Sequence, residues 1–229
     1  MKCLSVMSVL VGLAACADDT PVCEGLPSGA TLALTPRADT EVERLALRCS
    51  DALVASQARY DTLLADLDAI TVVRGARPRS YGALVGSELL IVAPSERIER
   101  LRSGANADFD CLNTQLHGRL FADDDSLVIS FPGALGSDAL AATYARVLGD
   151  DAEVFPDAVA GDGDSIQFDL RGSPHRYLVS LGSGDCPSGC INWSYELWQV
   201  DAGDAHLQAA WDKAADAPAG FQRADFECP

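Results

Sequence analysis

Eight cysteines are the feature that most constrains how this chain of 229 residues can fold. That number indicates either an oxidising compartment, where disulfides persist, or a metal site. The closest pair, Cys186 and Cys190, has a Cys-x₃-Cys spacing that zinc knuckles do not usually use, and the sequence has no second close pair of Cys or His. We therefore expect disulfides and no metal.

The first fifteen residues predict that the chain is exported. Lys2 supplies a small positive charge, and residues 4–13 form an apolar run interrupted only by Ser and Gly. A run of about ten apolar residues is too short to cross a bilayer as a helix, which needs about 20. Residues 1–15 are therefore interpreted as a signal peptide.

The end of this segment, Leu13-Ala14-Ala15-Cys16, resembles the lipobox of bacterial lipoproteins. The resemblance implies cleavage before Cys16, acylation of its thiol with chains such as palmitate, and membrane attachment in the bacterial cell envelope. Two or more acyl chains anchor a protein stably, whereas one does not. Asp18 resembles an inner-membrane retention signal of enteric-type bacteria; other lineages sort differently, so the choice between inner and outer membrane stays open. The alternative is a plain secretory signal.

The cysteine count is consistent with lipidation of Cys16. Cys3 leaves with the signal peptide, and an even number of cysteines then remains, as disulfides require. The disulfide candidates are Cys23, Cys49, Cys111, Cys186, Cys190 and Cys228. Six cysteines allow fifteen pairings, of which a local Cys186–Cys190 bridge and a Cys23–Cys228 bridge between the two ends are two possibilities.

The composition is that of a globular protein, with 48% hydrophobic and 22% charged residues. These values exclude a disordered chain and a multi-span membrane protein. The net charge is −17, from 34 acidic and 17 basic side chains. Because phosphate neutralisation needs a basic patch, no nucleic acid partner is expected.

The pattern after the signal peptide predicts a tether followed by a long N-terminal helix. Residues 16–36 contain several Pro and Gly residues and are expected to lift the domain off the membrane. Thr40 and Glu43 have capping-box spacing, and apolar residues follow at steps of three and four as far as Ile70. Such a helix either lies on the sheet of its own domain or forms a coiled-coil seam for a partner.

Residues 83–156 predict a split βαβ (ferredoxin-like) order of elements, β-α-β-β-α-β. The expected strands are residues 83–93, 109–120, 127–131 and 152–155, and the helices begin at Ser95 and Ser137. After a Gly161–Asp164 turn we expect antiparallel strands at 166–170, 177–181 and 191–200, with aromatic residues on both faces of the third, and a last helix at 204–214. Residues 37–229 are therefore expected to form a single disulfide-stabilised α+β domain.

No catalytic residue, metal ligand or cofactor is predicted. Aspartates at 123–125, 162 and 164 match no EF-hand loop and are typical of hairpin turns. The three histidines, His117, His175 and His206, lie in no HExxH pair, and no Gly-x-Ser-x-Gly sequence is present. A hydrolase would need a concave site that brings His175 together with Asp162 or Asp164.

The segment 184–190, Gly-Asp-Cys-Pro-Ser-Gly-Cys, resembles a motif of secreted and lipid-anchored bacterial proteins of unknown activity. As in that family, an aromatic strand follows it, and a disulfide could lock its turn. Residues 126–156 also resemble half of a subtilisin-propeptide-type inhibitor domain. We therefore expect an envelope lipoprotein that serves as a non-enzymatic binding or structural module for an unknown protein or small molecule. The alternatives are a protease-inhibitor-like domain and a hydrolase with an Asp/His site.

Overall fold

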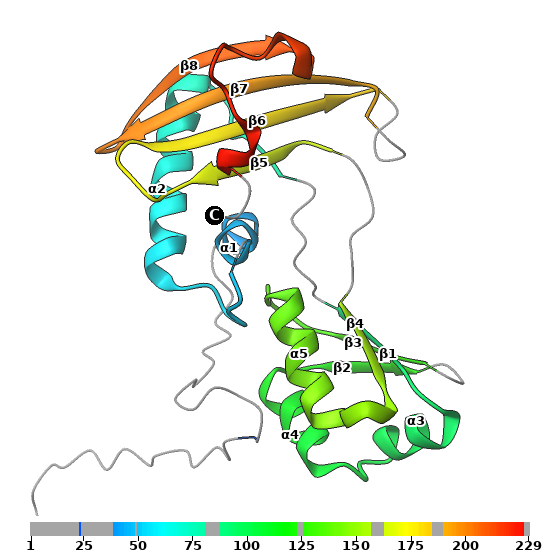
Figure 1. The fold of residues 1–229 in the computed structure, drawn as a ribbon. Coiled ribbons are helices and arrows are strands. Elements are labelled where there is room, and N and C mark those ends of the chain that lie inside the picture. Colours follow the sequence, from blue (N-terminus) through cyan, green and yellow to red (C-terminus); the bar gives the residue numbers. More distant parts are fainter. Residues whose placement is uncertain are drawn as a thin grey trace, which may run out of the picture.

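The fold was analysed in a computed structural model, which describes residues 23, 39–48, 50–80, 88–122, 126–156, 163–184 and 190–226. Over these residues the chain forms two four-stranded antiparallel sheets and five α-helices (Figure 1). The predicted combination of helices with antiparallel sheets is confirmed. The helices are α1 (Thr40–Leu47), α2 (Gln57–Arg74), α3 (Ser95–Arg102), α4 (Ala107–Gln115) and α5 (Ser137–Leu148). The strands are β1 (Glu88–Val92), β2 (Arg119–Ala122), β3 (Ser126–Ser130), β4 (Glu153–Pro156), β5 (Ser165–Asp169), β6 (His175–Ser183), β7 (Asn192–Asp201) and β8 (Asp204–Asp212).

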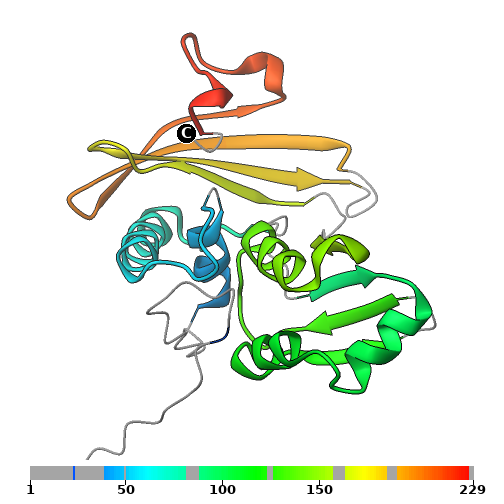
Figure 2. The same cartoon turned by 60° about the horizontal axis from the view of Figure 1, so that its bottom comes forward.

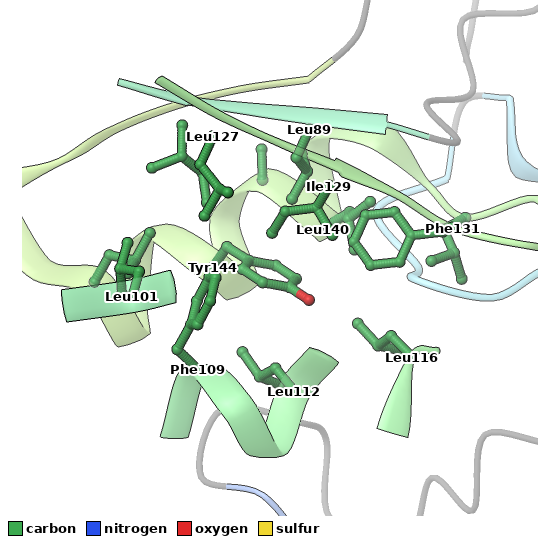
Figure 3. Close-up of a cluster of buried hydrophobic side chains, with 14 of the residues drawn as sticks. Leu89, Leu101, Phe109, Leu112, Leu116, Leu127, Ile129, Phe131, Leu140 and Tyr144 are labelled. Carbon is green, nitrogen blue, oxygen red and sulfur yellow. The ribbon is translucent and has the colours of Figure 1, made fainter. Parts of the chain in front are cut away.

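The first sheet has the strand order β2-β3-β1-β4, and α3, α4 and α5 supply the helical side of its core. Alternate residues of β1 and β3, such as Leu89 and Ile129, are fully buried there (Figure 3). Tyr144 of α5 lies at the centre, edge-on to Phe109 and Phe131, and its hydroxyl donates to Asn113 Oδ1 at 2.7 Å. The bond gives the buried Tyr144 hydroxyl the partner that it needs in an apolar core.

The second sheet has the order β5-β6-β7-β8 and is covered on both faces (Figure 2). One face packs on α1 and α2, while the segment after β8 folds over the other. The sequence-based faces of β7 are confirmed, because Tyr195 lies in the outer cluster and Trp198 and Val200 lie in the inner one. A two-residue turn joins β7 to β8, with positive φ at both Ala202 (50°) and Gly203 (89°), as tight hairpins require.

The long N-terminal helix predicted over residues 40–70 is wrong. The structure has two helices, α1 and α2, with an irregular segment between them. The apolar pattern with helical spacing continues from α1 into α2, because both helices bury one face under the second sheet. The pattern therefore does not reveal that the helix is interrupted. Ser56 caps α2 by accepting from Arg59 N at 3.3 Å, and α1 is capped by Asp39 and not by Thr40, which is its first residue.

Two further assignments are wrong in type. Residues 107–115 form helix α4, since Asn106 accepts from the backbone N of Phe109 at 3.0 Å and Phe109, Leu112 and Leu116 bury one helical face. Residues 204–212 form strand β8, because the tight turn before them pairs them with β7. In both segments the short apolar pattern is compatible with either period, and packing decides between them.

Contacts link the two halves of the fold. The irregular segment after α1 inserts Leu53 into the core of the first sheet, where its carbonyl accepts from Gly136 N at 3.0 Å. A side chain at Gly136 would collide with the carbonyl oxygen of Ala52, so glycine permits this close approach. The α1–α2 segment therefore contributes to both cores.

Candidate functional site

The candidate site is an open pocket of about 440 Å³ between the first turns of α2 and the hairpin of β5 and β6. Its lining combines the apolar side chains of Phe168 in β5 and of Leu170 after it with cationic and hydroxyl groups. Its lining consists of Ser56, Ala58, Arg59, Thr62, Phe168, Leu170, Arg171 and His175.

His175 is held in this wall by a buried carboxylate. Its Nδ1 lies 2.7 Å from Asp66 Oδ2, and the same oxygen accepts from the hydroxyl of Tyr177 at 2.5 Å. Burial, followed by the hydrogen bond to Asp66 and its charge, raises the pKa of Tyr177, so this hydroxyl is a permanent donor. Because an ionised carboxylate only accepts, the contact with Asp66 directs an Nδ1 proton of His175 toward this oxygen and fixes the orientation of the ring.

Arg59 supplies the pocket with a cation that pairs with no carboxylate of the described residues. Its guanidinium lies over the Phe168 ring at 5.3 Å and donates to the carbonyl of Arg48 at 3.0 Å. Arg48 in turn donates to the carbonyl of Ile166 at 2.7 Å. In the part of the chain that the structure describes, no ion pair joins Arg48 or Arg59 to an acidic side chain. Burial lowers the pKa of both arginines, and for Arg48 the charge of Arg223 adds to the effect.

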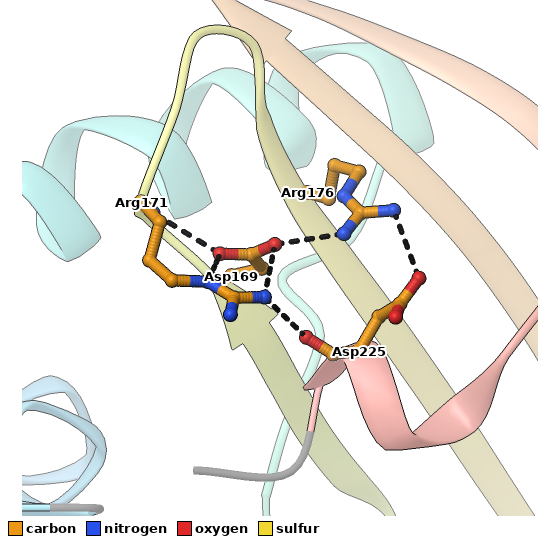
Figure 4. A network of polar contacts seen from close by, with 4 residues as sticks. All are labelled: Asp169, Arg171, Arg176 and Asp225. Atoms are coloured by element: carbon orange, nitrogen blue, oxygen red, sulfur yellow. Dashed lines mark hydrogen bonds and ion pairs between the residues drawn. The ribbon is translucent and has the colours of Figure 1, made fainter. Parts of the chain in front are cut away.

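Arg171, on the other side of the pocket, belongs to a network that connects β5 and β6 with the C-terminal segment (Figure 4). Asp169 accepts from Arg171 Nε at 2.9 Å and from Arg176 at 2.7 Å, and Arg176 also lies 3.5 Å from Asp225. The hydrogen bonds from the two arginines hold the pKa of Asp169 well below its usual range. Asp169 Oδ1 also accepts from the backbone N of Arg171 at 3.1 Å. Arg176 stacks on Phe226 at 5.1 Å, which further joins β6 to the C-terminal segment.

The N-terminus of α2 adds to the positive potential of the pocket. Its first turn contains no acidic residue, unlike those of α1, α3, α4 and α5. The unpaired amide groups at a helix start carry a partial positive charge that favours anions. Together with Arg59 and Arg171, this arrangement suits a small ligand that carries a carboxylate or a phosphate.

Of the other predicted residues, those that the structure describes lie apart from this pocket. His117 and His206 are exposed, and Asp164 accepts from the backbone N of Gly182 at 2.9 Å, away from His175. Aspartates 123–125 and 162 lie outside the described residues. Within the described ranges, no group of three or more His, Cys, Asp or Glu side chains is arranged to hold a metal ion.

Among the disulfide candidates, Cys23 is bonded to Cys111 of α4. The suggested Cys23–Cys228 bridge is therefore wrong, because the sulfur of Cys23 is already bonded to that of Cys111. Cys190 is also disulfide-bonded. Residues 16, 49, 186 and 228 lie outside the described part of the chain.

Comparison with known proteins gives no relative for this site. No family model, no curated protein and no solved structure matches the chain. None of the described helices combines the length and the apolar character that a membrane span requires.

His175 is among the residues that the sequence singles out, but its partner Asp66 is not. Asp66 is one of many acidic residues and lies far from His175 along the chain, so no local signal connects the two. Arg59 lies inside the single helix predicted over residues 40–70. That prediction places no helix start at Ser56, so it gives Arg59 no position near a helix N-terminus. The serine at position 56, a residue type that favours the N-cap, is the signal that could have located the N-terminus of α2. Its hydroxyl accepts from Arg59 N in the structure.

Proposed function

We propose that this protein is a lipid-anchored binding module of the bacterial cell envelope, and that the Arg59 pocket binds a small oxyanion ligand. The observation that supports the ligand class is Arg59, which pairs with no carboxylate in the described ranges and lies beside the start of α2, whose first turn has no acidic residue. The whole chain has a net charge of −17, so a pocket with a local excess of positive charge stands out. Binding of an anionic ligand would explain this excess.

The ligand class can be tested with inorganic phosphate and with succinate, each compared with sodium chloride at equal ionic strength. We expect at least one of the two anions to raise the unfolding temperature of the full chain, since ligands that bind only the native state stabilise it. Phosphate alone would indicate a phosphoryl ligand, and succinate alone a carboxylate ligand. Equal unfolding temperatures in all three salts would contradict the proposal.

A pair of substitutions separates the pocket from general charge effects. Arg59→Gln should weaken anion binding at least tenfold, because it removes the charge while keeping a polar side chain near Phe168. Arg102→Gln, on the surface of α3, changes the net charge equally but should leave binding unchanged. Equal binding by both variants would show that the anion does not use Arg59.

The lipid anchor rests on the resemblance of residues 13–16 to a lipobox, and the disulfide limits how far such an anchor could reach. Because Cys23 is bonded to α4, only residues 16–23 would separate the acylated thiol from the folded protein. An extended chain of that length spans at most about 25 Å. We propose that the α4 side of the first sheet is held close to the membrane, with a shorter tether than residues 16–36 alone suggest.

Mass spectrometry of the mature protein from membranes tests the anchor. We expect an N-terminal Cys16 that carries acyl chains, and Cys16→Ser should release the protein into the soluble fraction. An unmodified N-terminus, or cleavage at another residue, would contradict the anchor and leave the pocket proposal intact.

The finer fold assignment is also a proposal. We infer that residues 88–156 have a ferredoxin-like arrangement, with residues 37–229 acting as one domain. The strand order β2-β3-β1-β4, with every neighbouring pair antiparallel, supports the first inference. The hydrogen bond from Gly136 to Leu53 supports the second.

A hydrolase is the second candidate function, favoured by the 2.7 Å contact of His175 with Asp66. A carboxylate that orients a histidine in this way is typical of general-base sites. No described Ser, Thr or Cys side chain makes a hydrogen bond with His175, so the base would have to activate water. Turnover of p-nitrophenyl acetate that disappears in His175→Gln would favour this candidate, and equal background rates would dismiss it.

A further inference from the structure

The described lining of the Arg59 pocket contains one histidine, His175, and no other side chain of a type that titrates near neutral pH. Arginine keeps its charge throughout this range, whereas histidine takes up a proton there. We propose that an anion enters this pocket together with a proton that His175 takes up, so that the pocket holds its ligand more tightly at mildly acidic pH. The proposal rests on the oxyanion-binding function proposed above and names the group that regulates it.

The ring of His175 can donate a hydrogen bond to an anion only when it carries two protons. The 2.7 Å contact with Asp66 Oδ2 directs the Nδ1 proton toward the carboxylate. In the neutral ring Nε2 is then an acceptor, and an acceptor cannot bind an oxyanion. The protonated ring has an N–H group at Nε2 as well. None of the described groups makes a hydrogen bond with Nε2, so this donor is available to a ligand.

The charge of the pocket wall changes in the same direction. Asp66 places a negative charge beside a lining residue, and its side chain is only 10% exposed, so water screens this charge poorly. While His175 is neutral, the His175–Asp66 pair carries a negative charge that opposes the attraction of Arg59 for an anion. Protonation of His175 makes the pair neutral, and the positive charge of Arg59 then acts on the ligand without this opposition.

The other titratable or charged groups around His175 keep their protonation states in this range. From β6, Tyr177 donates its hydroxyl to the same carboxylate, and burial raises its pKa far above neutral pH. Arg59 of α2 and Arg171 after β5 line the same pocket and stay charged. The neighbour of His175 in β7 is the apolar Val200. His175 is therefore the group through which pH acts on this pocket.

Calorimetric titration of the full chain with sulfate and with oxalate tests the proposal. Both probes keep a constant charge from about pH 8 down to about pH 6, where histidine titrates. We expect at least one of them to bind at least fivefold more tightly at the lower pH, with proton uptake that two buffers of different ionisation enthalpy reveal. Equal binding at both pH values would overturn this proposal alone, whereas absence of binding at both would overturn the proposed oxyanion function with it.

Histidine variants assign the effect to one ring. The chain contains only three histidines, so few groups compete for the assignment. His175→Gln should remove the pH dependence and the proton uptake. His206→Gln changes an exposed histidine of β8 outside the pocket and should keep both. A pH dependence that survives in His175→Gln would overturn the proposal.

Nuclear magnetic resonance of the natural chain gives a test that needs no folded His175 variant. The ring signals of the three histidines can be titrated with and without saturating sulfate or oxalate, whichever binds. Because binding and protonation are linked, the bound anion should move the titration midpoint of His175 to higher pH and leave those of His117 and His206 in place. An unchanged midpoint of His175 in the presence of the bound anion would overturn the proposal.

Discussion

The two sheets of this protein have the same number of strands and the same antiparallel pairing, but they are buried differently. The second sheet packs on helices with one face and on the C-terminal segment with the other. In the first sheet, helices cover one face, and the register aligns a row of apolar side chains across all four strands of the opposite face. This row is Phe121, Val128, Leu90 and Phe155.

The side chains of this row are partly exposed, whereas the residues on the other face of β1 and β3 are buried. Phe121, Leu90 and Phe155 are 59%, 37% and 44% exposed, whereas Leu89 and Ile91 beside Leu90 are fully buried. Neighbouring positions along a strand point to opposite faces, so in the first sheet they should differ strongly in their contribution to stability. In the second sheet they should contribute similarly. The following predictions test this contrast, starting with the largest expected effect.

The largest effect should come from the disulfide, which holds the helical layer of the first sheet. Replacing both Cys23 and Cys111 by Ser should lower the free energy of unfolding by about 4 kcal/mol, because the bridge closes a long loop, with a sequence separation of 88. Urea unfolding without reductant measures the loss. Hydrogen exchange should accelerate more in α4 than in β6, and equal acceleration in both would contradict a local effect on the first sheet.

Adjacent leucines of β1 provide the matched test of the first sheet. Leu89→Ala should lower the free energy of unfolding by about 3 kcal/mol, because it leaves a cavity in the core, whereas Leu90→Ala should cost less than about 1 kcal/mol. Chemical denaturation of the two variants gives the comparison. Similar losses would mean that the open face is covered in solution.

Adjacent residues of β6 provide the corresponding test of the second sheet. Leu178 faces the outer cluster and Val179 the inner one, and both are buried. Leu178→Ala and Val179→Ala should each lower the free energy of unfolding by about 2–3 kcal/mol, since each leaves a cavity. A small cost for Leu178→Ala would show that the C-terminal segment does not seal the outer face.

Among the buried positions tested, the smallest effect should come from the network that holds this C-terminal segment. Asp169→Asn should cost about 2 kcal/mol at neutral pH, because it weakens hydrogen bonds from two arginines to a buried carboxylate. The pKa of Asp169 is depressed in the folded state, so its contribution is present above the ordinary carboxyl pKa and is lost as the pH falls through the lower, folded value. The gap between variant and natural chain should therefore narrow below about pH 4, and a constant gap would contradict this origin.

Local sequence patterns were sufficient to predict those helices and strands whose ends are marked by neighbouring residues. The helix Ser137–Leu148 and the strand Ser126–Ser130 lie close to their predicted positions, since an amphipathic period that stops at Gly149 defines the first and a clear alternation defines the second. The helix at 107–115 and the strand at 204–212 were misassigned, because short apolar patterns fit both periods and only the packing partner selects one. The single long helix is misassigned for a related reason, because its apolar period continues across the break that the structure has between Leu47 and Gln57.

The candidate sites show the same division. The sequence by itself determined the acidic charge, the number of cysteines and the aromatic strand after the cysteine motif, because each is a property of composition or of neighbouring residues, while export and lipidation stay predictions. Only the tertiary structure decided that Cys23 joins Cys111, that Asp66 holds His175 and that Lys213 meets Trp193. Such contacts join residues far apart along the chain, and they follow from how whole helices and sheets pack and not from any local pattern.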